Sequence, residues 1–137
     1  MVILESSNLN PEEVVRQNYI KKLLKQGFNP HLIVIEKKIS QLPHLVNENK
    51  KLFPNRRIDI LCYRLDGAIL RPHLLIECKA VKLNDNMRRQ LMGYNYYIKA
   101  PLIALVSAEE EYVALYDKAT LSWSWTKASL QDRYRHL

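Results

Sequence analysis

Two oppositely charged side chains follow an apolar segment and could do chemistry together. Glu77 and Lys79 come directly after Leu74-Leu75-Ile76, a run that we expect to form the interior of a central strand. Side chains alternate along a strand, so Glu77 and Lys79 point to the same face. A carboxylate and an ammonium leaving a core strand together are costly unless they are paired or functional. The pattern indicates either an ion pair at a strand end or part of a catalytic site.

A second carboxylate interrupts another apolar run. Asp59 stands within residues 58–62, which should also lie in the interior. A carboxylate inside a strand usually needs a cation or several hydrogen-bond donors. If Asp59 lies beside Glu77, the two supply hard oxygen ligands, which suit Mg²⁺ or Mn²⁺ better than zinc. The alternative is that Asp59 pairs with Arg57, two residues away on the same face.

A third carboxylate belongs to an expected helix near the start of the chain. Asn10 can cap this helix, and Pro11 suits its first position. At 3.6 residues per turn, Glu13 falls in line with Ile20 and Leu24 on the buried stripe. From there its carboxylate can reach a metal site at the edge of the stripe. The alternative is a capping box in which Glu13 partners Asn10.

A second expected helix carries polar side chains that could contact DNA. Gln90 and Tyr94 are four residues apart and so lie on one helical face. Arg88 and Arg89 precede them. An amide, a phenol and two guanidinium groups suit a surface that contacts phosphates and bases. The alternative is that Gln90 and Tyr94 are ordinary helix residues.

Hydrophobic periodicity predicts the elements that position these residues. We expect helices over residues 10–26 and 84–99, and strands over residues 32–35, 57–63, 74–79, 102–106 and 112–116. Residues 121–125 alternate apolar residues with Ser, so that Trp123 and Trp125 share one face. Residues 40–55 form a surface loop, and a short helix follows from Lys127. The order α-β-β-β-α-β-β predicts an α/β or α+β fold with helices flanking one mixed sheet.

The turn between the second and third strands decides whether Asp59 can reach Glu77. A plain two-residue turn at Asp66-Gly67 pairs Leu65 with Ala68, and it therefore places Asp59 opposite Leu74. Asp59 and Glu77 would then lie on opposite faces of the sheet. A shared metal site requires a wider loop or a β-bulge between residues 64 and 72 that shifts the register by an odd number.

Length and charge bound the class of protein. The 137 residues fit one domain, residues 1–137, and 21 basic against 14 acidic side chains give a net charge of +7. The whole excess lies in residues 49–99, with 11 basic and 4 acidic side chains. A localised basic region is typical of proteins that bind a polyanion such as DNA, although it can also be a solvated surface.

Several classes of function are excluded or disfavoured. The chain contains no GxxxxGK[ST] or GxGxxG motif for phosphate binding, and its histidines show no zinc-type spacing. No apolar run approaches the ~18–20 residues of a membrane span, and the N-terminus does not resemble a signal peptide. The two cysteines, Cys62 and Cys78, cannot form a disulfide framework, which favours a reduced, cytoplasmic setting.

Taken together, these motifs resemble the PD-(D/E)XK nuclease superfamily and, more narrowly, the N-terminal nuclease domain of type I restriction enzyme R subunits. The resemblance covers roughly residues 10–117. It rests on Pro11-Glu12-Glu13-Val14-Val15-Arg16-Gln17, Arg57-Ile58-Asp59-Ile60, Leu75-Ile76-Glu77-Cys78-Lys79-Ala80, Gln90 with Tyr94, and Lys99-Ala100-Pro101. Ile58 replaces the proline for which the superfamily is named.

The resemblance implies a restriction-endonuclease-like core and a metal-dependent DNA endonuclease that hydrolyses phosphodiester bonds. Asp59, Glu77 and the backbone carbonyl of Cys78 would bind Mg²⁺ or Mn²⁺, and Glu13 would be an additional or water-mediated ligand. Lys79 would orient and activate the attacking water.

The resemblance also implies how the chain meets its partners. Gln90 and Tyr94, with the neighbouring Arg88 and Arg89, would hold the phosphate or the DNA near the metal. DNA is the expected partner, with a second copy of the chain or other restriction-modification subunits as possible further ones, and no membrane. The alternative is a DNA-binding or assembly module on the same fold with little or no nuclease activity.

Overall fold

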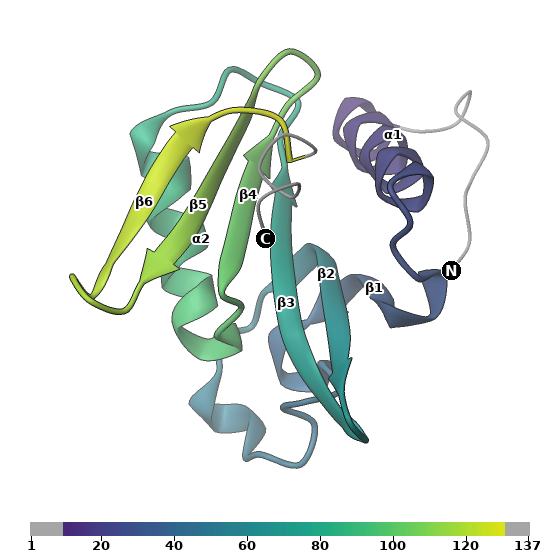
Figure 1. The fold of residues 1–137 in the computed structure, drawn as a ribbon, viewed down its shortest axis with the longest axis vertical. Coiled ribbons are helices and arrows are strands. Elements are labelled where there is room, and N and C mark those ends of the chain that lie inside the picture. Colours follow the sequence, from purple (N-terminus) through teal and green to yellow (C-terminus); the bar gives the residue numbers. More distant parts are fainter. Residues whose placement is uncertain (1–9, 131–137) are drawn as a thin grey trace.

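The structure, a computed structural model, describes residues 10–130. It is an α+β fold with one mixed six-stranded sheet and two α-helices (Figure 1). The elements are α1 (Pro11–Lys25), β1 (Ile33–Lys38), β2 (Arg57–Asp66), β3 (Ile69–Cys78), α2 (Asp85–Ile98), β4 (Leu102–Val106), β5 (Glu111–Asp117) and β6 (Ser122–Lys127). The predicted order of elements lacks the last strand, because the segment that alternates tryptophan with serine forms β6. The predicted helix after Lys127 falls mostly outside the described residues.

Each helix begins where the sequence predicts, because an asparagine side chain caps it. The Oδ1 of Asn10 accepts a hydrogen bond from the N–H of Glu13 at 2.9 Å, and Asn84 caps Met87 in the same way at 3.0 Å. Helix α1 ends at Lys25, and Gly27 follows in a left-handed conformation with φ of +96°. Such a conformation favours glycine, which is why the chain can turn there.

The strands follow one another in sheet order, and only one neighbouring pair is parallel. Strands β1, β2 and β3 pair antiparallel, as do β4, β5 and β6, whereas β3 and β4 run parallel. A parallel pair needs a crossover connection, and α2 supplies it. The C-terminal end of β3, which carries Glu77, therefore lies beside the C-terminal end of β4.

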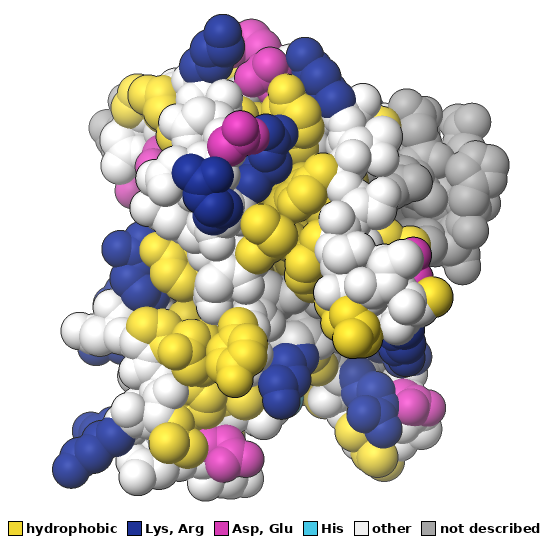
Figure 2. Space-filling model, turned by 90° about the vertical axis from the view of Figure 1, so that its left-hand side faces the viewer, with side chains coloured by type: hydrophobic (Ala, Val, Ile, Leu, Met, Phe, Trp, Pro, Cys, Tyr) yellow, Lys and Arg dark blue, Asp and Glu magenta, His cyan; other side chains and the backbone are white. Residues whose placement is uncertain are grey.

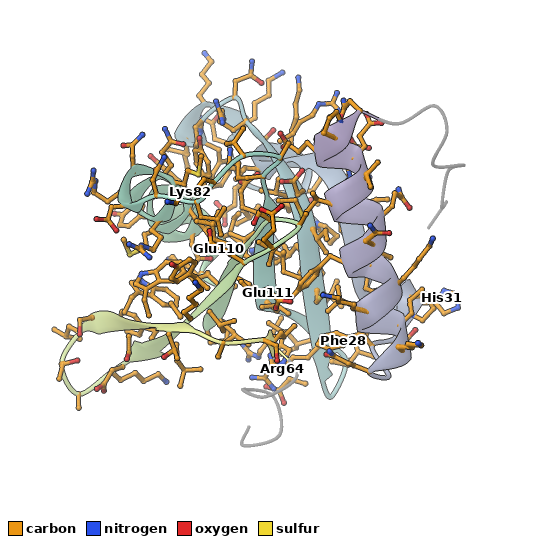
Figure 3. All side chains as sticks on the ribbon, turned by 90° about the horizontal axis from the view of Figure 1, so that it is seen from above. Phe28, His31, Arg64, Lys82, Glu110 and Glu111 are labelled. Atoms are coloured by element: carbon orange, nitrogen blue, oxygen red, sulfur yellow. The ribbon has the colours of Figure 1, made fainter. Side chains whose placement is uncertain are left out.

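The two helices cover opposite faces of the sheet, as the views along two directions show (Figures 1 and 3). On one face, α1 packs its buried stripe on the sheet through Val15, Tyr19, Ile20 and Leu23. On the other face, Leu91 and Ile98 of α2 pack against the strands. Trp123 and Trp125 both contact this second core, so the predicted shared face of the two tryptophans is confirmed.

The hairpin between β2 and β3 differs from a plain Asp66-Gly67 turn. Asp66 pairs with Ile69 across a turn formed by Gly67 and Ala68, and this register continues to Tyr63 opposite Pro72. The next pair is Cys62 with Leu74, which leaves an additional residue, His73, on β3. Of the two predicted alternatives, a wider loop or a β-bulge, the bulge is confirmed, but its predicted position within residues 64–72 is wrong by one residue. Pro72 has no N–H to donate, and a proline within a strand is typical of such an irregularity.

The segment between β1 and β2 is more ordered than the predicted surface loop. Two short 3₁₀ helices, Ile39–Gln41 and Lys50–Leu52, interrupt it, and both Ile39 and Leu42 are fully buried. His44 also anchors it, since its ring nitrogens lie 2.6 Å from the Tyr63 hydroxyl and 2.9 Å from the Ile98 carbonyl. Burial lowers the pKa of His44. None of the helices among residues 10–130 is long and apolar enough to cross a membrane.

Candidate metal centre

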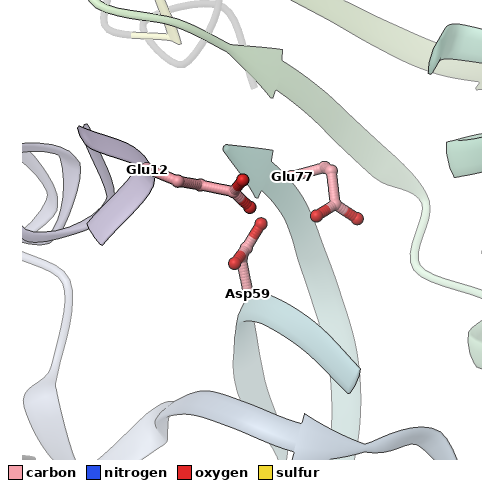
Figure 4. Close-up of side chains that lie close together, drawn as sticks. All are labelled: Glu12, Asp59 and Glu77. Carbon is pink, nitrogen blue, oxygen red and sulfur yellow. The ribbon is translucent and has the colours of Figure 1, made fainter. Parts of the chain in front are cut away.

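Three carboxylates from distant parts of the sequence meet at one end of the sheet. One ligand oxygen from each of Glu12, Asp59 and Glu77 lies within 4.8 Å of the other two (Figure 4). Glu12 comes from the first turn of α1, Asp59 from β2 and Glu77 from the end of β3. Among residues 10–130 this is the one group of His, Cys, Asp and Glu side chains with such spacing.

The bulge at His73 brings Asp59 and Glu77 together. Beyond the bulge Ile60 pairs with Ile76, so Asp59 and Glu77 are the next residues across from one another. Compared with a turn at Asp66-Gly67, the observed turn at Gly67 and Ala68 shifts the register by two, and the bulge shifts it by one more. The total shift is therefore odd, as the shared site requires. The predicted proximity of Asp59 and Glu77 is confirmed.

The helix contributes Glu12 to this cluster and not Glu13. Glu12 lies one turn before Arg16 and two turns before Tyr19, both of which are buried. The buried stripe of α1 therefore runs through Glu12, a helical spacing that the sequence already contains. Glu13 lines the same cavity, and its N–H takes part in the cap with Asn10. Its predicted role as an additional metal ligand stays a prediction.

Asp59 is held by a buried arginine that the sequence analysis did not single out. Nη1 of Arg16 donates to Oδ1 of Asp59 at 3.2 Å, and Oδ2 of Asp59 accepts the N–H of Cys78 at 2.8 Å. The second guanidinium nitrogen of Arg16 lies 3.3 Å from Oε1 of Glu36. The alternative pairing of Asp59 with Arg57 is wrong, because Arg57 donates to the backbone carbonyl of Glu36.

Burial and like charge act together on Glu77. Desolvation, a hydrogen bond with Asp59 and the charge of Asp59 raise the pKa of Glu77 to about 9, and the charge of Glu12 adds to this. The ammonium of Lys79 acts in the opposite direction. Three carboxylates that lie this close together in a partly buried position repel one another, and a bound cation reduces this repulsion.

The three carboxylates line a cavity of about 660 Å³ at this end of the sheet. Lys79 lines this cavity with them, and so do Arg16, Arg56 and Arg57. The predicted shared face of Glu77 and Lys79 thus places both in one cavity. A metal ion would find carboxylate oxygens there, which are the ligands that Mg²⁺ and Mn²⁺ prefer. The donor set fits such an ion.

The residues predicted to hold DNA lie on α2, and one of them, Tyr94, contacts an arginine that lines the cavity. The guanidinium of Arg56 lies 5.0 Å from the ring centre of Tyr94, so Tyr94 supports an arginine that lines the cavity. Gln90 and Arg89 are exposed. Arg88 forms an ion pair with Asp85 and lies 4.9 Å from the ring centre of Tyr112.

The arginines that line the cavity are not those that we expected near the carboxylates. Arg88 and Arg89 do not line the cavity, whereas Arg56 and Arg57 do. Arg57 begins the strand that carries Asp59 and Arg56 directly precedes it, and that adjacency in the sequence was the available signal. The part played by Arg88 and Arg89 in DNA binding stays a prediction.

A second cavity of about 510 Å³ lies at the opposite end of the sheet, next to the start of β4. It is lined by residues of α2, β5 and β6, including Tyr96, Tyr116 and Trp123. Figure 2 shows hydrophobic side chains gathered on this side of the molecule. None of the predicted site residues lines this cavity.

One comparison with known proteins identifies a relationship over most of the chain. The sequence model of the family described as type I restriction enzyme R protein N terminus (HSDR_N) matches residues 11–124. The matched segment contains all three carboxylates of the cluster, as well as Arg16 and Lys79. No curated protein matches the chain.

Proposed function

We propose that this chain, which belongs to the type I restriction enzyme R protein N-terminal family, is a metal-dependent DNA endonuclease domain that hydrolyses phosphodiester bonds. One observation supports this above all: Glu12, Asp59 and Glu77 converge within 4.8 Å in a cavity that Lys79 also lines. A protein that only binds DNA needs no such cluster of carboxylates beside the phosphates. Family membership supports DNA and restriction-modification subunits as partners.

The roles of the residues follow from their chemistry. Asp59 and Glu77, with Glu12 from the helix and the carbonyl of Cys78, hold Mg²⁺ or Mn²⁺. When bound, the ion lowers the pKa of a bound water and offsets the charge that develops on the phosphate. Lys79 orients the attacking water and adds a further positive charge.

Arginines beside the carboxylates guide the DNA backbone to them. Arg56 and Arg57 line the cavity, and Tyr94 holds Arg56 in place from α2. Gln90 lies one turn before Tyr94 and extends the same helical face toward the DNA. Because phosphate contacts release counterions, binding of DNA to this surface falls steeply as the salt concentration rises.

The proposal is tested by nicking and cleavage of plasmid DNA in the presence of Mg²⁺ or Mn²⁺. Glu77→Gln removes a ligand charge at nearly constant size, and Lys79→Ala removes the ammonium while leaving the carboxylates intact. Each change should reduce cleavage by about 10²-fold or more, as loss of a transition-state interaction does. DNA binding without metal should survive both changes.

Matched variants outside the cavity control for changes in charge alone. Glu48→Gln and Lys82→Ala alter exposed side chains and should leave cleavage unchanged. Circular dichroism shows whether each variant is folded. A folded wild-type chain that binds DNA but never cleaves it with either metal would contradict the proposal and support a DNA-binding or assembly module. Equal activity in the wild type and both site variants would contradict the assignment of the site.

A further inference from the structure

Arg16 is the most buried charged side chain in the described part of the molecule, and it lies between two carboxylates. It is only 5% exposed. Its guanidinium contacts Asp59 at 3.2 Å and Glu36 at 3.3 Å. A guanidinium keeps its charge under all ordinary conditions, so these contacts place a permanent positive charge next to the candidate metal centre.

The strand register arranges the acidic residues in a row. Ile35 pairs with Ile60 and Lys37 with Ile58, so Glu36 lies across from Asp59. Asp59 in turn lies across from Glu77 on β3. Glu36, Asp59 and Glu77 therefore succeed one another on three adjacent strands. Arg16 joins the first two, and the proposed metal ion joins the last two.

The backbone at Glu36 is held in a conformation that an ordinary strand residue avoids. Its φ is +50°, in the left-handed region that is unfavourable for a residue with a side chain. Arg57 donates to the Glu36 carbonyl at 3.2 Å, and Arg16 binds the Glu36 carboxylate. Two arginines thus stabilise Glu36 where its charge faces Arg16.

We infer that Arg16 takes the place of a second cation, so that the centre binds one divalent ion per chain. This inference rests on the proposed function. The guanidinium of Arg16 lies between Glu36 and Asp59 and offsets the charge of both carboxylates. One divalent ion can bind between Asp59 and Glu77, whereas a second one would have to occupy the position between Glu36 and Asp59 that Arg16 fills.

Arg16 also sets the position of the helix. It lies one turn after Glu12, so the ion pairs that tie Arg16 to β1 and β2 fix the first turn of α1 against the sheet. Arg16 is therefore a positioning residue, which acts on the metal through Asp59 and Glu12. Its charge and its position make distinguishable contributions, because a lysine preserves the charge and methionine preserves only the bulk.

The number of Mn²⁺ ions bound per chain tests this inference without any measurement of cleavage. Mn²⁺ is titrated into the full chain, and the free ion is followed by electron paramagnetic resonance. We expect one ion for the wild type and for Arg16→Lys, and two for Arg16→Met. The double variant Arg16→Met with Glu36→Gln should bind one ion again, because the additional carboxylate is gone.

Arg71→Met is the matched control, since it removes an arginine from an ion pair with Asp66 that lies outside the cavity. It should bind one ion. Arg16→Gln, which keeps hydrogen-bond donors without charge, replaces Arg16→Met if circular dichroism shows that the methionine variant is unfolded. A folded, neutral variant at position 16 that binds one ion overturns the inference about Arg16, and so does a wild type that binds two. A wild type that binds none overturns the proposed metal site itself.

Discussion

The two ends of the sheet each contain a buried polar centre, and the two centres are built in opposite ways. At the start of β4, the side chain of Asn95 donates to the carbonyl of Ala100 and accepts its N–H, both at 2.9 Å. At the end of β3, Asp59, Glu77 and Glu12 lie close together, and burial together with the neighbouring carboxylates raises the pKa of Glu77. One centre is neutral and satisfied by the protein itself, whereas the other concentrates like charges.

This difference is the one expected between a structural site and the proposed metal site. A neutral amide with both of its groups paired stabilises the junction between α2 and β4 and needs no ligand. Crowded carboxylates destabilise the fold in the absence of a cation, and an arrangement that is unfavourable for the free protein is typical of binding and catalytic sites. Substitutions at the two centres should therefore change stability in opposite directions.

The largest effect on stability should come from Asn95→Ala. The change leaves the N–H and carbonyl of Ala100 without their partner, in a place where Asn95 is only 4% exposed. We expect the free energy of unfolding to fall by about 3 kcal/mol, as measured by urea denaturation. Asn18→Ala, at an exposed position of α1, should have a much smaller effect. A fall in the free energy of unfolding of less than about 1 kcal/mol for Asn95→Ala would show that this junction contributes little to stability.

Glu77→Gln should stabilise the metal-free protein near pH 7.5. The pKa of Glu77 is about 9 in the folded chain and 4.5 ordinarily, so the folded state binds a proton that the unfolded state has released. Protonated Glu77 makes its full contribution to the stability of the wild type below about pH 4.5, and this contribution is lost as the pH rises toward 9.

The difference between wild type and Glu77→Gln isolates this residue from other titrating groups. Thermal melts with a chelator present, from pH 5 to pH 9, should show the advantage of the variant growing with pH. Addition of Mn²⁺ should stabilise the wild type more than the variant. An advantage that does not change with pH would contradict the electrostatic origin of the effect.

A smaller effect is expected at Gly93, which lies away from both centres on the exposed side of α2. A Cβ at this position would meet nothing within 4 Å. Gly93→Ala should therefore stabilise the helix by about 1 kcal/mol, as measured by thermal denaturation. Gly67→Ala provides the contrast, because Gly67 has open space but a φ of +62°, and that change should destabilise. Destabilisation by Gly93→Ala would show that another part of the molecule needs this surface.

Local features of the sequence were sufficient to predict most of the secondary structure. The asparagine caps, Gly27 and the apolar runs place α1, α2 and β4 within a residue of their observed ends. Strand β3 begins five residues earlier than predicted, because its exposed first half pairs only with β2 in the hairpin and lacks a continuous apolar run. Hydrogen bonding between strands, more than periodicity, extends this element.

The cluster shows which features of the site are determined by adjacent residues and which depend on the packing of distant elements. Alternation along the chain determines that Glu77 and Lys79 point to the same face, because alternation depends on adjacent residues alone. The choice of Glu12 over Glu13 depends on how α1 is rotated against the sheet, and the pairing of Arg16 with Asp59 joins residues 43 apart. The proximity of Asp59 to Glu77 depends on one additional residue at the bulge. A register and a helix rotation are properties of two elements in contact, so only the tertiary structure decided them.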